Sequence, residues 1–223
     1  MTFGSNRGSK VIIVKMESLL LSETIEVWDQ IWSDIKSKGR QKKSVCTYSV
    51  ASRKKVNPNN PGLQYSQLRD EIQTLLDNDV PVVVAAGNEA QKDGGRPDVD
   101  TAPAVFEGPD YPIIVIGNCN NAGGRTASSQ AGNHLAIWAP GTNVPCLDYN
   151  EDATSSVIKT GTSFCESTPS FLYMYQRGGK ANAEHEVAAP LTAGVLATFL
   201  AYDEVPFIVG QGHIMLCERR KLK

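Results

Sequence analysis

The chain has 223 residues, of which 41% are hydrophobic and 21% charged, and its formal net charge is −2. This length suffices for one domain with a sizeable core. Because nucleic-acid binding normally requires an excess of basic residues, the charge argues against a nucleic-acid partner. The aliphatic run Val11–Val14 lies between lysines and is too short for a signal peptide or a membrane span, so we expect no membrane association and leave localisation open.

The predicted elements alternate between apolar strands and amphipathic helices. Val11–Val14 is a β-branched run of the kind that is buried on both faces of a parallel sheet. A helix is predicted over Ser22–Lys38, because its apolar residues recur at helical spacing and Gly39 ends it. The later predictions are strands at 44–50, 80–86, 113–116, 135–138 and 156–159, and helices at 63–76 and 188–201. This alternation predicts an α/β fold with a doubly wound, open parallel sheet.

The stretch Cys165–Val187 does not fit this alternation. It carries Pro169 and the pair Gly178-Gly179 among mixed polar residues, without helical or strand periodicity. A structureless stretch of this length is uncommon inside a compact domain. We therefore predict a loop or disordered insertion.

The cysteines give no sign of a metal centre. The chain has five of them, widely scattered and without a Cys-x-x-Cys pair: Cys46, Cys119, Cys146, Cys165 and Cys217. Because zinc sites normally need closely spaced ligands, we predict no metal site, and nothing else in the sequence points to a cofactor. Any disulfide pairing stays open.

Two short segments contain residue types that suit catalysis. Val82–Asn88 places small residues and an asparagine after a buried strand, at the sheet edge where α/β proteins bind ligands. The NH2 group of Asn88 can face developing negative charge there. Thr160–Ser163 suits a helix N-terminus, where Ser163 can act as a nucleophile. Taken singly, each segment is better explained as an ordinary turn or helix cap.

Together with four further segments, these two resemble the subtilisin family. Val82–Asn88 is similar to the family's oxyanion segment, and Ser49-Val50-Ala51 to its Ser-Leu-Gly substrate-binding strand. Gly161-Thr-Ser163, followed by Ala188-Ala-Pro190 and Ala193-Gly194, resembles the signature Gly-Thr-Ser-x-Ala-x-Pro-x-Val-Ala-Gly. The other similar stretches are 11–15, 101–104 with 111–117, and 128–130 with 137–141.

The resemblance implies a Ser-His-Asp endopeptidase that acts on polypeptide substrates. Ser163 would be the acylating nucleophile, and the Asn88 side chain with the Ser163 NH would hold the tetrahedral oxyanion. Extended peptide main chain would enter a cleft lined by Ser49, Ala51, Ala85 and Gly87. Ala51 replaces a family glycine, and its methyl group is expected to weaken substrate binding.

The chain departs from the family in the residues that activate the serine. The family's Asp-Ser/Thr-Gly and His-Gly-Thr-His motifs both precede the strand that 11–15 matches. No Asp occurs before Asp29 and no His before His134, and we do not expect His134, His185 or His213 to substitute. We therefore expect the N-terminal part of the family domain to be missing and the chain as written to be inactive, because a serine without a base is a weak nucleophile.

These departures define the predicted organisation: a partial subtilisin-like domain over 1–207, a non-family insertion at 165–187, and a tail over 208–223. Removing the insertion restores Gly-Thr-Ser-Phe-Ala-Ala-Pro, so we hypothesise that it is translated intron sequence or another gene-model error. The alternative function is a non-catalytic pseudopeptidase that binds peptides. A small-molecule α/β enzyme is a weaker interpretation, because no GxGxxG or P-loop is present.

Overall fold

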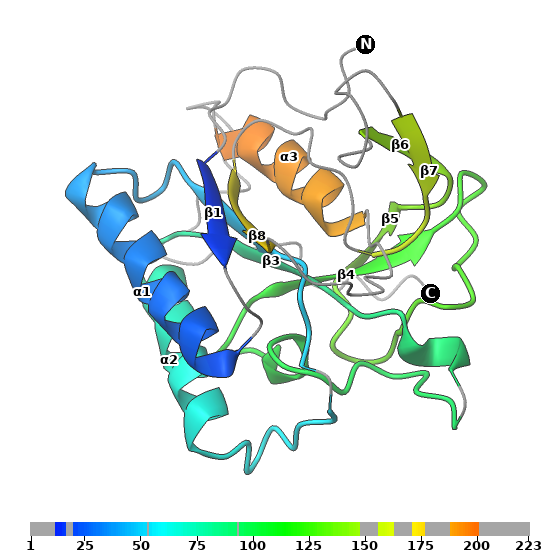
Figure 1. Cartoon of the computed structure of the whole chain (residues 1–223), viewed down its shortest axis with the longest axis horizontal. Helices are drawn as coiled ribbons and strands as arrows, with labels where there is room; N and C mark the ends of the chain where they lie inside the picture. Colours follow the sequence, from blue (N-terminus) through cyan, green and yellow to red (C-terminus); the bar gives the residue numbers. More distant parts are fainter. Residues whose placement is uncertain are drawn as a thin grey trace.

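A six-stranded parallel sheet forms the centre of the molecule, in the order β1-β8-β2-β3-β4-β5 (Figure 1). The computed structural model describes residues 12–16, 20–52, 54–92, 94–147, 156–162, 171–176 and 188–200. The sheet strands are β1 (Ile12–Met16), β2 (Val45–Tyr48), β3 (Val82–Ala85), β4 (Ile114–Cys119), β5 (Ile137–Pro140) and β8 (Phe171–Gln176). β6 (Val144–Leu147) and β7 (Ser156–Lys159) form a separate antiparallel pair.

Helices cover both faces of this sheet: α1 (Leu21–Ser37) and α2 (Leu63–Leu76) lie on one face, and α3 (Ala188–Leu200) lies on the other (Figure 1). Val82 and Val84 of β3 belong to the core cluster with α1 and α2, whereas Val83 and Ala85 belong to the cluster with α3. Successive side chains of a strand point to opposite faces, so a strand covered on both faces must be apolar throughout. The predicted doubly wound α/β architecture is confirmed. In the described part of the chain, no helix is long and apolar enough to cross a membrane.

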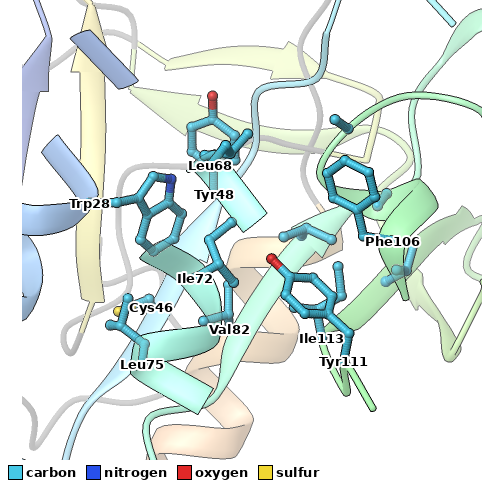
Figure 2. Packing of buried hydrophobic residues seen from close by; sticks show 14 of the residues in the cluster. Trp28, Cys46, Tyr48, Leu68, Ile72, Leu75, Val82, Phe106, Tyr111 and Ile113 are labelled. Atoms are coloured by element: carbon cyan, nitrogen blue, oxygen red, sulfur yellow. The ribbon is translucent and has the colours of Figure 1, made fainter. Parts of the chain in front are cut away.

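The larger core lies between the sheet and the helices α1 and α2. Trp28 of α1 is fully buried and makes an edge-to-face contact with Tyr48, with ring centroids 5.6 Å apart. Ile72 of α2 is buried in the same cluster, and Phe106 and Tyr111 form a second edge-to-face pair within it (Figure 2). The contact between Trp28 and Tyr48 joins α1 to the end of β2.

Several predicted boundaries differ from the observed ones for local reasons. α1 begins at Leu21, because the backbone N and Oγ1 of Thr24 both donate to the Leu20 carbonyl and close the first turn there. β1 is not buried on both faces, since Ile12 and Val14 are only half-buried in a strand that pairs with β8 alone. β6 was not predicted, because a four-residue strand that contains Pro145 carries no clear period-2 pattern.

The predicted loop at 165–187 was wrong for six of its residues. Phe171–Gln176 is the strand β8, which pairs in parallel with five residues of β1 and two of β2. Its aromatic and aliphatic residues suit a strand, but they stand between Pro169 and Gly178, which we took as loop signals. Residues 165–170 and 177–187 lie outside the described residues, as does the predicted tail at 208–223.

The core between the sheet and α2 gives a first prediction. Ile72→Ala should lower the free energy of unfolding by about 2–5 kcal/mol, because a fully buried side chain is replaced by a cavity. Leu63→Ala on the same helix is the control: Leu63 is 76% exposed, and its loss should cost no more than about 0.5 kcal/mol. Urea denaturation followed by tryptophan fluorescence measures both. Equal losses would contradict the assigned packing of α2.

Candidate active site

The carboxyl ends of β2, β3 and β4 lie side by side, and most of the predicted site residues follow these strands. Tyr48 pairs with Val84, so Ser49 and Ala85 come next at the same level of the sheet. Ala85 pairs with Ile116, which brings Asn118 to the level of Gly87. The parallel register therefore gathers residues from three distant parts of the sequence at one sheet edge, where α/β proteins place their ligands.

Asn88 contacts the residue that precedes the predicted nucleophile. Its Oδ1 accepts a hydrogen bond from the backbone N of Thr162 at 3.4 Å, although the two residues are 74 positions apart. Asn88 is 9% exposed and Thr162 is fully buried. The amide oxygen is turned toward Thr162, and the NH2 end of the same side chain is the kind of donor that an oxyanion site uses. Ser163 itself lies outside the described residues.

A second contact joins Thr162 to the start of α3. The backbone N of Ala189 donates to the Thr162 carbonyl at 2.8 Å. If residues 165–187 were absent, Ala189 would be the fourth residue after Thr162, which is the spacing of an α-helical hydrogen bond. The observed bond is therefore the one that a helix running from Thr162 directly into α3 would make.

Gly161 lies beside Gly141, the residue after β5, close to the end of β4. Its backbone N donates to the Gly141 carbonyl at 2.8 Å. A Cβ on Gly141 would lie 2.4 Å from the Gly161 carbonyl oxygen and 2.7 Å from Oδ1 of Asn118, so this approach requires a glycine. Asn118 is fully buried, and its Nδ2 lacks a partner within the described residues. The sequence analysis missed Asn118, whose only signal was a polar residue near the end of an apolar strand.

A cavity of about 280 Å³ opens beside the end of β2. Of the four residues predicted to line a peptide cleft, Ala51 borders this cavity, whereas Ser49, Ala85 and Gly87 do not. The rest of its wall comes from α1, α2, the end of β2 and loop residues, and it is mixed: Leu21, Tyr48, Val50, Tyr65, Leu68 and Ala102 stand beside the polar Thr24, Ser52 and Lys54. The apolar part of this lining suits an apolar side chain.

The ionisable groups near the end of β2 are held neutral by burial. Burial raises the pKa of the Cys46 thiol far above neutrality, and it raises the pKa of Tyr48 to about 12. Neither group therefore supplies a nucleophile or a base at neutral pH.

His134 is the one histidine in the part of the chain that the structure describes, and it lies in a turn ahead of β5. Its Nδ1 lies 3.0 Å from the backbone oxygen of Glu107 and 3.5 Å from Oε2 of the same residue. The ring is therefore engaged with Glu107, ahead of β4. His185 and His213 lie outside the described residues.

Comparison with known proteins agrees with this geometry. A model of the subtilase family matches residues 2–204. The chain belongs to the subtilase family. A subtilisin-like protease of Coccidioides posadasii (strain C735) is 24% identical over 209 residues, which cover 92% of this chain and 40% of that protein.

Solved structures of two proteases show the same fold. A cold-adapted subtilisin-like serine proteinase has a TM-score of 0.51 at 19% identity, over 82% of this chain and 49% of the other. The prenylagaramide maturation protease PagA has a TM-score of 0.53 at 16% identity, over 82% of this chain and 50% of the other. This subtilase chain thus spans half or less of the length of these relatives.

The backbone before Asn88 provides a second prediction. Gly87 has φ +103°, and a Cβ there would lie 2.1 Å from Oε1 of Gln130. Gly87→Ala should therefore destabilise the fold through both backbone strain and overlap, by about 2–5 kcal/mol.

Gly123→Ala separates these two causes. Gly123 has φ +82° with nothing within 4 Å of a new Cβ, so this variant should cost only the backbone strain of about 1–2 kcal/mol. Urea unfolding of both variants measures the difference. Similar losses would show that Gln130 moves aside without cost.

Proposed function

We propose that this chain supplies the serine and oxyanion half of an endopeptidase site that hydrolyses peptide bonds in polypeptides. In this site Ser163 is the nucleophile, and the Asn88 side chain with the Ser163 NH binds the tetrahedral oxyanion. The observation that carries the proposal is the 3.4 Å contact between Asn88 Oδ1 and the backbone N of Thr162. Membership of the subtilase family supports it.

The reaction also needs a base, and His134, the one histidine among the described residues, is engaged with Glu107. As the Ser163 hydroxyl attacks the scissile carbonyl, its proton passes to a histidine that an aspartate orients, and the same histidine then protonates the leaving amine. Water hydrolyses the resulting acyl-enzyme by the same route. No Asp precedes Asp29 and no His precedes His134. Hydrolysis by this site therefore requires a segment that carries both groups, placed ahead of residue 1.

Substrate main chain is proposed to lie between Ser49–Ala51 and Ala85–Gly87. These segments follow the neighbouring parallel strands β2 and β3, whose register places Ser49 level with Ala85. The cavity beside Ala51 would receive an apolar substrate side chain. The Ala51 methyl group narrows the approach of the peptide main chain, which should weaken binding relative to glycine at this position.

The need for a base leads to a third prediction. A fluorophosphonate probe should not label the chain 1–223, because the Ser163 hydroxyl has no proton acceptor. It should label a fusion that carries the Asp- and His-bearing segment of a subtilase ahead of residue 1 and joins Phe164 directly to Ala188. Gel fluorescence measures the labelling, which Ser163→Ala should abolish in the fusion and Ser66→Ala, at an exposed hydroxyl on α2, should leave intact. Serine-dependent labelling of 1–223 alone would show that a base has been overlooked.

The alternative, a pseudopeptidase that binds peptides without cleaving them, is favoured by the cavity beside Ala51, whose described lining comes from α1, α2 and the residues around the end of β2. The same fusion distinguishes the two functions. A monodisperse preparation that binds a fluorescent peptide, yet neither cleaves it nor reacts with the probe, would support the pseudopeptidase.

Residues 165–187 are proposed to interrupt a helix that otherwise runs from Thr162 into α3. The hydrogen bond from Ala189 N to the Thr162 carbonyl supports this proposal, because it joins the two sides of the interruption with helical spacing. β8 comes from the same segment and lies between β1 and β2. Without the segment, another parallel strand must fill this position, and the Asp- and His-bearing segment is its proposed source.

Peptide mapping of the native protein tests the interruption and gives a fourth prediction. Digestion with two proteases, followed by mass spectrometry, should yield a peptide in which Phe164 is joined to Ala188. The tryptic peptide 70–92 serves as the recovery control, because both forms of the chain contain it. Peptides lying wholly within 166–184 would overturn the proposal.

A further inference from the structure

Gln130 contacts Gly87, the residue before Asn88, with both its backbone and its side chain. Its backbone N donates to the Gly87 carbonyl at 2.8 Å, and its Oε1 lies against the position that a Cβ on Gly87 would occupy. Gln130 is fully buried, and within the described part of the chain its Oε1 has no hydrogen-bond partner. Because an unsatisfied buried acceptor is costly, other contacts must hold the amide in this orientation.

Those contacts lie at the nitrogen end of the same amide. Nε2 of Gln130 donates to the Asp98 carbonyl at 2.6 Å and to Oδ1 of Asp100 at 3.0 Å. Arg96 binds both carboxylate oxygens of Asp100, through Nε at 2.8 Å and Nη2 at 2.6 Å, and Lys55 lies 3.5 Å away. The paired carboxylate thus fixes which end of the Gln130 amide faces Gly87.

From these contacts we infer that Gln130 is a positioning residue for Asn88, and that the Arg96–Asp100 ion pair sets its orientation. The inference rests on the proposed oxyanion role of Asn88. The Gln130 backbone bonds the Gly87 carbonyl and its side-chain amide occupies the space beside the Gly87 Cα, and Gly87 leads directly into Asn88. Asn88 is thereby directed toward Thr162, where a displacement of about 1 Å would cost up to about 100-fold in rate.

The charge of Asp100 gives this arrangement a defined pH range. Burial opposes the charge, but hydrogen bonds from Arg96 and Gln130 outweigh it and hold the pKa of Asp100 below its ordinary value. Because the pKa of Asp100 is lower in the folded chain, its ion pair contributes fully to stability at pH values above the ordinary pKa of an aspartate. That contribution is lost as the pH falls through the lowered, folded-state pKa. The charged groups facing this carboxylate are Arg96 and Lys55.

NMR of the isotope-labelled chain 1–223 tests the positioning role without requiring activity. Asp100→Asn and Gln130→Glu should both shift the backbone amide signal of Thr162 and the side-chain NH2 signals of Asn88. Gln130→Glu keeps the shape of the side chain but loses the donor. Asp34→Asn is the matched control, because Asp34 is also ion-paired with a lowered pKa, yet it lies on α1 with Lys38 and Arg40 as partners. That variant should leave these signals in place.

Acid titration adds a readout that a purely structural role would not produce. In the unmodified chain the Thr162 signal should move at a pH below about 3.9, and Asp100→Asn should abolish that movement. Circular dichroism verifies folding. If Gln130→Glu fails to fold, Asp100→Asn, which keeps Gln130, decides alone. Unchanged Thr162 and Asn88 signals in Asp100→Asn would overturn the positioning role.

The active fusion separates this inference from the proposed function. There Asp100→Asn should lower kcat by about 10- to 100-fold with little change in KM, because the transition state and not the bound peptide depends on Asn88. A fusion that never hydrolyses peptide, combined with the expected NMR shifts, would reject the endopeptidase function and retain the positioning role. Normal kcat in Asp100→Asn, with hydrolysis intact, would overturn the positioning role alone.

Discussion

Burial of β3 and β4 on both faces is the constraint on which the rest of the structure depends. Val82 and Val84 face α1 and α2 while Val83 and Ala85 face α3, and β4 divides its residues in the same way. Only a parallel strand covered by helices on both sides satisfies such a sequence. The double covering leaves no room for polar side chains within β3, so chemistry can begin only where this strand ends.

Polar groups accordingly gather at and just past the strand ends, where many of them form hydrogen bonds with one another. Asn88 accepts from Thr162, the backbone N of Asn118 donates to Ser129 Oγ at 3.0 Å, and Gln130 bonds to Asp98 and Asp100. Burying such groups is costly unless they are hydrogen-bonded, so the cluster is held in few arrangements. This rigidity is what an oxyanion site requires, since its donors must be in place before charge develops.

In the proposed function, the oxyanion half of the site and its base belong to different parts of the fold. The proposed oxyanion donors and the proposed approach of the peptide depend on β2 to β5 and the start of α3. Proton transfer depends on groups that the family carries on a different part of its fold. The strand between β1 and β2 lies where these two parts meet. The sheet is continuous only when a segment fills that position, which β8 occupies here.

The amino-acid sequence by itself determined the α/β class, the whole of α2 and β7, and the approximate extents of β2 to β5. These elements repeat apolar residues at strand or helix periods, and such local patterns dominate when both faces of a strand are buried. Ordered motifs also indicated the family and pointed to Asn88 and Ser163, because each motif is a short contiguous run that can be recognised without the structure.

Only the tertiary structure decided what lies beside what. Phe171–Gln176 became a strand because it pairs with both β1 and β2, and this pairing outweighed the loop signals on either side of the segment. Gln130 and Asp100 acquired their relation to Gly87 because the chain folds back over more than 40 positions to place Gln130 there. Contacts between residues far apart in sequence are set by packing and register, and packing and register exist only once the chain has folded.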